Sequence, residues 1–64
     1  MEFTYTLHAE EQIEARKMPK IWVEETVKFP DVTKYQNGKY YAIKKLNGLT
    51  LKVVYTKERY INII

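Results

Sequence analysis

Apolar residues are spaced for helices in the first half of the chain and alternate with polar residues in the second half. In the first half, Pro19 separates two helical segments, because proline breaks a helix interior. We expect one helix at about residues 7–18, started by Thr6, whose hydroxyl can accept a hydrogen bond from a free amide of the first turn. A second helix at about residues 19–28 should stop ahead of Pro30, since the residue before a proline avoids helical geometry.

The second half contains two Asn-Gly pairs, Asn37-Gly38 and Asn47-Gly48, each flanked by alternating apolar residues. Asn-Gly is a preferred pair for a two-residue hairpin turn of type I′, in which both central residues need a positive φ. Two hairpins joined by such turns, and a further turn ahead of the apolar end of the sequence, predict four strands. We expect these strands at about residues 31–36, 39–46, 49–56 and 60–64.

The two turns also predict the register of the hairpins, with Tyr35 opposite Tyr40 and Ala42 opposite Val53. Side chains alternate across a strand, so this register sorts the strand residues onto two faces. The face expected to meet the helices collects Thr33, Tyr35, Tyr40, Ala42, Lys44, Leu46, Leu49, Leu51, Val53 and Tyr55, with Ile61 and Ile63 of the last strand joining it. The opposite face collects Val32, Lys34, Gln36, Lys39, Tyr41, Ile43, Lys45, Thr50, Lys52, Val54 and Thr56.

This order of elements predicts an α+β fold, with two N-terminal helices packed on one face of a four-stranded antiparallel β-meander. We interpret residues 1–64 as a single domain. A chain this short buries only about 60% of the surface that it exposes when unfolded, so its core must be thin. It has no cysteine for a disulfide or a thiolate metal site, which leaves self-association as an open way to bury more surface.

Positive charge is concentrated in the second half of the chain. Residues 1–32 have four basic and seven acidic side chains, a net charge of −3, whereas residues 33–64 have seven basic and one acidic, a net charge of +6. No apolar run approaches the roughly 20 residues of a membrane helix, and the first residues lack the basic start of a signal peptide. We therefore expect a soluble cytoplasmic protein whose second half favours anionic partners.

Several stretches carry a family resemblance. They are Thr6-Leu7-His8-Ala9, Arg16, Pro30-Asp31, Tyr40-Tyr41-Ala42-Ile43-Lys44 and Leu51-Lys52-Val53-Val54-Tyr55. Together they resemble the small bacterial family known as domain of unknown function 4258, over nearly the whole chain. By layout alone, the two helices and the meander are similar to small ribonuclease toxins of the RelE/BrnT and barnase kinds. Gln12 departs from the family pattern, which often has an arginine there, so an activity that depends on that arginine would be weakened.

The candidate catalytic residues begin with a polar stripe on the first helix. His8, Gln12 and Arg16 are spaced by four residues and therefore share one helix face. A ribonuclease that works without a metal needs a base for the ribose 2′-hydroxyl, a proton donor for the leaving oxygen and cations for the charge on phosphorus. The candidates for these roles are His8, Arg16, Lys44 and Tyr55.

Each of these residues also has a purely structural interpretation. His8 lies near a helix start and could bond to the backbone, and Arg16 could lie across the sheet edge and pair with Glu14 or with a carboxylate of the second helix. Lys44 is the one charged residue on the expected core face, so its ammonium should pass the edge of the first helix to reach water or pair with an acid such as Glu11.

The basic strand face has two interpretations as well. Its lysines could hold phosphates while its tyrosine stacks on a base, as in proteins that bind single strands without sequence preference. Alternatively, the lysines keep a solvent-facing sheet soluble and discourage edge pairing. The candidate RNA-binding residues are Lys34, Lys39, Tyr41, Lys45 and Lys52.

Two functions remain open from the sequence. One is a small RNA-acting domain with metal-independent phosphodiester cleavage. The other is a non-catalytic module that binds a protein, such as an acidic antitoxin, or a second copy of the chain as a homodimer. We expect no cofactor and no metal, because the sequence has no glycine-rich phosphate loop, no pair of histidines and no carboxylate spacing typical of a metal cage.

Overall fold

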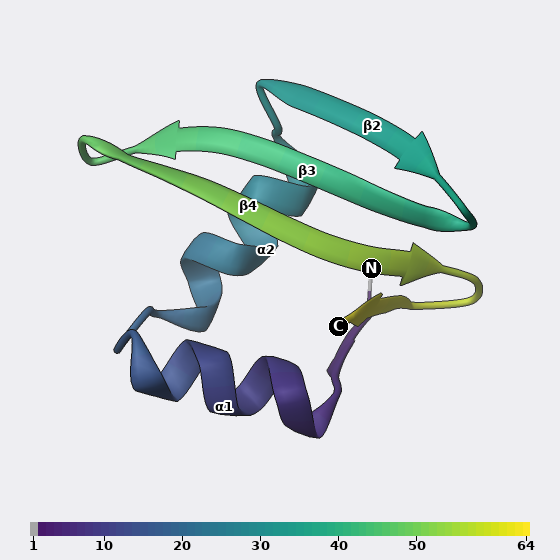
Figure 1. Cartoon of the computed structure of the whole chain (residues 1–64), viewed down its shortest axis with the longest axis horizontal. Coiled ribbons are helices and arrows are strands. Elements are labelled where there is room, and N and C mark those ends of the chain that lie inside the picture. The colour runs from purple at the N-terminus through teal and green to yellow at the C-terminus, as the bar shows by residue number, and fades with distance from the viewer. Residues whose placement is uncertain (1) are drawn as a thin grey trace.

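The computed structural model describes residues 2–64 and has an α+β fold, with two helices beneath a curved mixed sheet (Figure 1). The sheet has five strands in the spatial order β1-β5-β4-β3-β2. Each expected helix and strand is present, and every end lies within three residues of its predicted position. In chain order the elements are β1 (Phe3–Tyr5), α1 (Leu7–Ala15), α2 (Lys20–Lys28), β2 (Val32–Gln36), β3 (Lys39–Leu46), β4 (Leu49–Lys57) and β5 (Ile61–Ile63).

The predicted four-stranded antiparallel meander is wrong in one respect, because the sheet has a fifth strand that runs parallel to its neighbour. β1 pairs with β5 in parallel, with Phe3 opposite Ile61 and Tyr5 opposite Ile63. The Ile61 amide donates to the Glu2 carbonyl at 2.8 Å, and the Thr6 amide donates to the Ile63 carbonyl at 3.0 Å. β1 thus pairs the outer edge of β5, which a meander would leave open.

Both Asn-Gly turns adopt the expected geometry. Asn37 and Asn47 each have a φ of 52°, and Gly38 and Gly48 have φ values of 77° and 78°. Both central residues of each turn therefore have the positive φ of a type I′ hairpin. The predicted register is confirmed along both hairpins, including Tyr35 opposite Tyr40 and Ala42 opposite Val53.

The first helix begins as predicted but ends three residues early. The Thr6 hydroxyl accepts a hydrogen bond from the Ala9 amide at 3.1 Å. At the other end, Lys17 takes a left-handed backbone with a φ of 51°, and the Met18 amide turns back to the Ile13 carbonyl at 3.0 Å. This is a Schellman motif, which ends α1 before Pro19 is reached.

The core is thin and lies mainly between α2 and the middle of β3 and β4. Ala42 is fully covered, as is Thr26, whose hydroxyl donates to the Trp22 carbonyl at 2.8 Å. The buried apolar residues are Ala9, Val23, Val27, Ala42, Leu51, Val53, Tyr55, Ile61 and Ile63. The expected places of Ile61 and Ile63 in the core are therefore confirmed.

Part of the expected core face is exposed. Tyr35 and Leu49 keep 65% and 54% of their surface accessible. The turns at the ends of the long hairpins extend past the two helices (Figure 1), and both residues lie close to these turns. Strand alternation predicted which face a residue is on, whereas burial depends on how far the helices reach.

A polar network joins β1 to both helices. The Tyr5 hydroxyl donates to the Glu24 carboxylate at 2.8 Å. The Lys20 ammonium lies 2.6 Å from the Glu10 carboxylate and 4.6 Å from the centre of the Tyr5 ring. Burial, and next the bond to Glu24, raises the pKa of Tyr5 well above its usual range, so its phenol stays protonated as a donor.

We expect the Tyr5→Phe variant to lose less stability than the native protein when the pH is raised into the alkaline range. Below pH about 10 the phenol is protonated in both the folded and the unfolded chain, and its contribution is fully present. Above that pH the unfolded chain loses the proton first, so stability falls as the pH rises toward the folded-state pKa. Urea unfolding at about pH 8 and about pH 11 should show a smaller loss for Tyr5→Phe than for the native protein.

Tyr60→Phe is the matched control, because Tyr60 lies exposed in the turn between β4 and β5. This variant should lose as much stability between the two pH values as the native protein. If Tyr5→Phe loses as much stability between the two pH values as the native protein does, then the hydrogen bond to Glu24 does not contribute to the loss of stability at alkaline pH.

Candidate functional site

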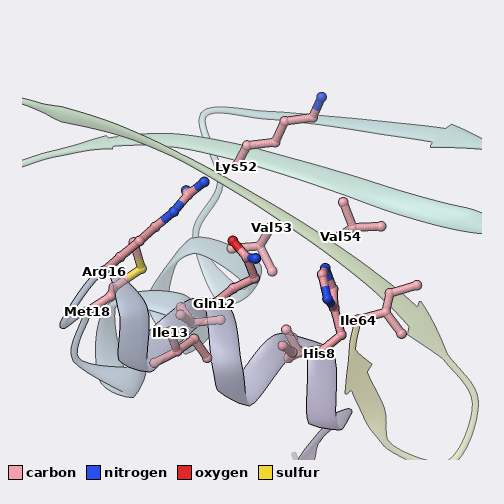
Figure 2. A pocket seen from close by; sticks show the side chains of 12 residues that line it. His8, Gln12, Ile13, Arg16, Met18, Lys52, Val53, Val54 and Ile64 are labelled. Atoms are coloured by element: carbon pink, nitrogen blue, oxygen red, sulfur yellow. The ribbon is translucent and has the colours of Figure 1, made fainter.

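A groove lies between α1 and β4, where β5 no longer covers the sheet (Figure 2). β5 pairs only with the last part of β4, from Tyr55 to Lys57. The hollow beyond it has a volume of about 200 Å³. A neighbouring hollow of about 240 Å³ shares Arg16, Met18 and Lys52 with it and extends along β4 to Leu49. We call the two hollows together the α1–β4 groove.

One rim of the groove is the polar stripe predicted on the first helix. His8, Gln12 and Arg16 are exposed, and all three side chains extend from α1 toward β4 (Figure 2). Spacing by four residues puts them in one row. The expectation that they share one helix face is therefore confirmed, and this face borders the groove.

The floor of the groove is apolar. Ile13 and Met18 are half-buried, Val53 is buried, and Ile64 closes one end. The Ile64 amide donates to the Val54 carbonyl at 3.0 Å and so continues the line of β5 by one residue. The site is thus a narrow apolar trough with polar side chains along its helix side.

The groove carries positive charge without a compensating acid. No Asp or Glu lines either hollow, whereas Arg16 and Lys52 line both. In the described part of the chain, residues 2–64, no carboxylate lies within ion-pair distance of Arg16, and the observed pair joins Lys20 to Glu10. The expected pairing of Arg16 with Glu14 or with α2 is therefore wrong, and the guanidinium is available to an anion.

Lys44 lies on β3 and contacts the C-terminal end of α2, and it does not line the groove. Its ammonium donates to the Phe29 carbonyl at 2.8 Å, just past the last turn of α2. A lysine suits this place because the carbonyl end of a helix carries partial negative charge. The expectation that Lys44 passes α1 or pairs with Glu11 is wrong, because the nearer end of α2 provides a partner.

Tyr55 also does not line the groove. It is 7% exposed and stacks on Tyr40 with ring centres 5.1 Å apart. Burial, followed by the neighbouring Tyr40 phenol, raises the pKa of Tyr55. Of the four candidate catalytic residues, the structure thus brings His8 and Arg16 to one groove and places Lys44 and Tyr55 elsewhere.

The candidate RNA-binding residues share the sheet face that turns away from the helices. The register places Lys34 opposite Tyr41 and Lys45 opposite Thr50, so these side chains project on the same side of the sheet. Lys39 and Lys52 follow the same alternation. The Lys52 ammonium lies 5.5 Å from the centre of the half-buried Tyr41 ring, so a base that stacked there would have to displace it.

Lys52 connects the two candidate surfaces, because it belongs to the basic strand face and also lines the groove. Two features of this site could not be read from the sequence. Met18 was predicted as the last residue of the first helix, and the bounds predicted for the last strand, about residues 60–64, did not show how much of β4 it would cover. The clue was the difference in length between β4, with nine residues, and the short apolar segment after its turn.

Comparisons with protein families, with curated proteins and with solved structures find no match. The resemblance to domain of unknown function 4258 stays a prediction. Across residues 2–64, no three His, Cys, Asp or Glu side chains gather where they could hold a metal ion. Neither helix of the described chain has the length and hydrophobicity to cross a membrane.

Proposed function

We propose that this domain binds single-stranded RNA and cleaves it at the α1–β4 groove. The observation that carries this proposal is the convergence of His8 and the unpaired Arg16 on a groove without acidic side chains. An RNA phosphate is an anion that such a groove attracts. The basic strand face continues from Lys52 and offers lysines to the neighbouring phosphates.

The chemistry that this groove suits is attack by the ribose 2′-hydroxyl on the adjacent phosphorus. His8 takes the proton of the 2′-hydroxyl as the oxygen bonds to phosphorus. Arg16 stabilises the negative charge that develops on the phosphate oxygens. The bond from phosphorus to the 5′-oxygen breaks, and that oxygen takes a proton from solvent. The products are a 2′,3′-cyclic phosphate and a 5′-hydroxyl end.

Lys52 and Lys57 provide a matched test of RNA binding. Both lie on β4, but Lys52 projects on the basic strand face and Lys57 projects on the other side. We expect Lys52→Gln to weaken binding of an oligouridine about threefold to tenfold and to lower the salt slope by about 0.7, which is one phosphate contact on a single strand. Lys57→Gln should change binding less than about twofold.

Fluorescence anisotropy over a series of salt concentrations measures both quantities. Binding that is equally weakened by Lys52→Gln and Lys57→Gln would mean that net charge, and not this face, attracts the RNA. If the affinity for the oligouridine does not change with salt concentration, the protein does not bind RNA through its phosphates, and this part of the proposal is wrong.

A second function, a protein-interaction module, is supported by a different observation. The floor of the groove is apolar, and the edge of β4 beside it is open. An extended protein segment uses both features, whereas a phosphate uses neither. Concentration-dependent association that survives high salt, without RNA cleavage, would favour this second function.

A further inference from the structure

The first half of β4 has main-chain groups that point into the α1–β4 groove. Leu49 closes the two-residue turn in a hydrogen-bonded pair, so Leu51 and Val53 exchange hydrogen bonds with β3 in the alternation of an antiparallel ladder. The amides and carbonyls of Thr50 and Lys52 therefore point the opposite way, toward the groove.

These groups have no partner in the described chain. The pairing of β4 with β5 stops at Tyr55, and only the bond between Ile64 and Val54 extends it. Within residues 2–64, no hydrogen bond reaches the groove side of Thr50 or Lys52. An open strand edge is a template for one more strand.

The space beside this edge is shaped for such a strand. It continues the line of β5 past Ile64, and the two hollows of the groove follow it along β4. Arg16 stands on the α1 side of both hollows, and Lys52 stands on the β4 side. A strand placed here would have Arg16 on its α1 side and an apolar floor beneath it, and it would lie next to Lys52, whose side chain projects from β4 away from α1 (Figure 2).

We propose that the α1–β4 groove binds an extended, acidic segment of a partner protein, which adds a strand to the sheet alongside β4. Main-chain hydrogen bonds to Thr50 and Lys52 would hold the segment, as in other cases of strand addition. Charge complementarity with Arg16 and Lys52 selects an acidic segment, because the groove has no acid of its own.

The alternation of side chains along β4 predicts which residue types the partner segment has at successive positions. The residue opposite Lys52 shares the outward face with it, so an acid fits there. The residue opposite Leu51 faces the helix side, where Met18 contributes to the groove, so an apolar side chain fits there. In either strand direction the segment alternates acidic and apolar residues.

A second copy of this chain suits the groove less well. The outer strands of its sheet are β1 and β2, and neither strand contains an acidic residue. Most acidic side chains of residues 2–64 lie on the helices α1 and α2 and are not available as a strand. A segment of a different protein therefore suits the groove better than a second copy does.

This inference does not depend on action on RNA. If both proposals are correct, the bound segment covers His8 and Arg16 and blocks cleavage. Binding of the segment is measured without RNA, so the two proposals fail separately.

The test uses a fluorescent peptide of alternating glutamate and valine, with two threonine variants of the protein. Thr50→Pro removes an amide that points into the groove, and Thr33→Pro removes an outward amide on β2, an outer strand of the sheet. Neither change alters charge. We expect Thr50→Pro to weaken peptide binding about fivefold or more, the effect of one lost hydrogen bond, and Thr33→Pro to leave it within about twofold.

A second measurement keeps the test valid if a proline variant unfolds. Peptide binding to the native protein should slow amide hydrogen exchange at Thr50 and Lys52, and a peptide N-methylated on its pairing edge should not bind. The inference is overturned if the peptide does not bind, if the N-methylated peptide binds equally well, or if the two proline variants respond alike. Protection of the same amides by a second copy alone, seen as dimerisation in sedimentation, would also overturn it.

Discussion

Ile61→Ala is expected to lower the free energy of unfolding by about 3 kcal/mol, because it removes a buried side chain from a core that cannot collapse around the cavity. Ile61 is 3% exposed and lies on β5, between β1 and β4. A domain of this size has a total stability of roughly 3 to 10 kcal/mol. The variant should therefore be only marginally folded in the absence of urea and largely unfolded at low urea concentrations.

Ile21→Ala is the control, because it makes the same change on a side chain that is 62% exposed on α2. Alanine is also the better helix former, so this variant should stay within about 0.5 kcal/mol of the native protein. Urea denaturation followed by circular dichroism gives both values. Equal effects of the two substitutions would contradict the placement of β5 inside a five-stranded sheet.

The hairpins could be predicted residue by residue because their chemistry is local. A type I′ turn allows few residues at its centre, and Asn-Gly at residues 37–38 and 47–48 sets the register of every pair that follows. The Thr6 cap was predictable for the same reason, since its partner Ala9 lies three residues away.

β1 could not be predicted in this way. Phe3-Thr4-Tyr5 has residues that favour strands, but three residues are too few to show an alternating pattern. Its partner β5 is nearly a whole chain length away and runs parallel to it, so no turn connects the two. The pairing depends on tertiary contacts that no local signal encodes.

The end of α1 shows a similar limit. Pro19 indicated that a helix must stop, but the structure ends it earlier, where Lys17 adopts a left-handed backbone that usually favours glycine. Lysine carries no sign of this conformation in the sequence. The early stop makes Met18 part of the groove floor instead of a helix face.

The candidate site was half predictable. Spacing put His8 and Arg16 in one row on α1, and alternation put Lys52 on the basic strand face, which are both local inferences. That these residues meet at one groove depends on β5 being too short to cover β4. Alternation also put Tyr55 on the face that meets the helices, where it is buried and stacks on Tyr40. The partner of Lys44 depends on where α2 ends, which periodicity does not reveal.

His8→Ala is expected to lower RNA cleavage at least about 100-fold, since a general base contributes roughly that much or more to catalysis. RNA binding should change little, because the strand lysines stay in place. Glu11→Ala is the control, as Glu11 is exposed on the same helix and does not line the groove. It should leave the cleavage rate unchanged within about twofold.

The catalytic role of the α1–β4 groove is tested by cleavage of an end-labelled oligouridine with the native protein, His8→Ala and Glu11→Ala, purified in parallel. We expect the native protein and Glu11→Ala to cleave it, leaving 2′,3′-cyclic phosphate and 5′-hydroxyl ends, and His8→Ala to lose this activity. No cleavage by the native protein, or equal cleavage by all three, would contradict this role.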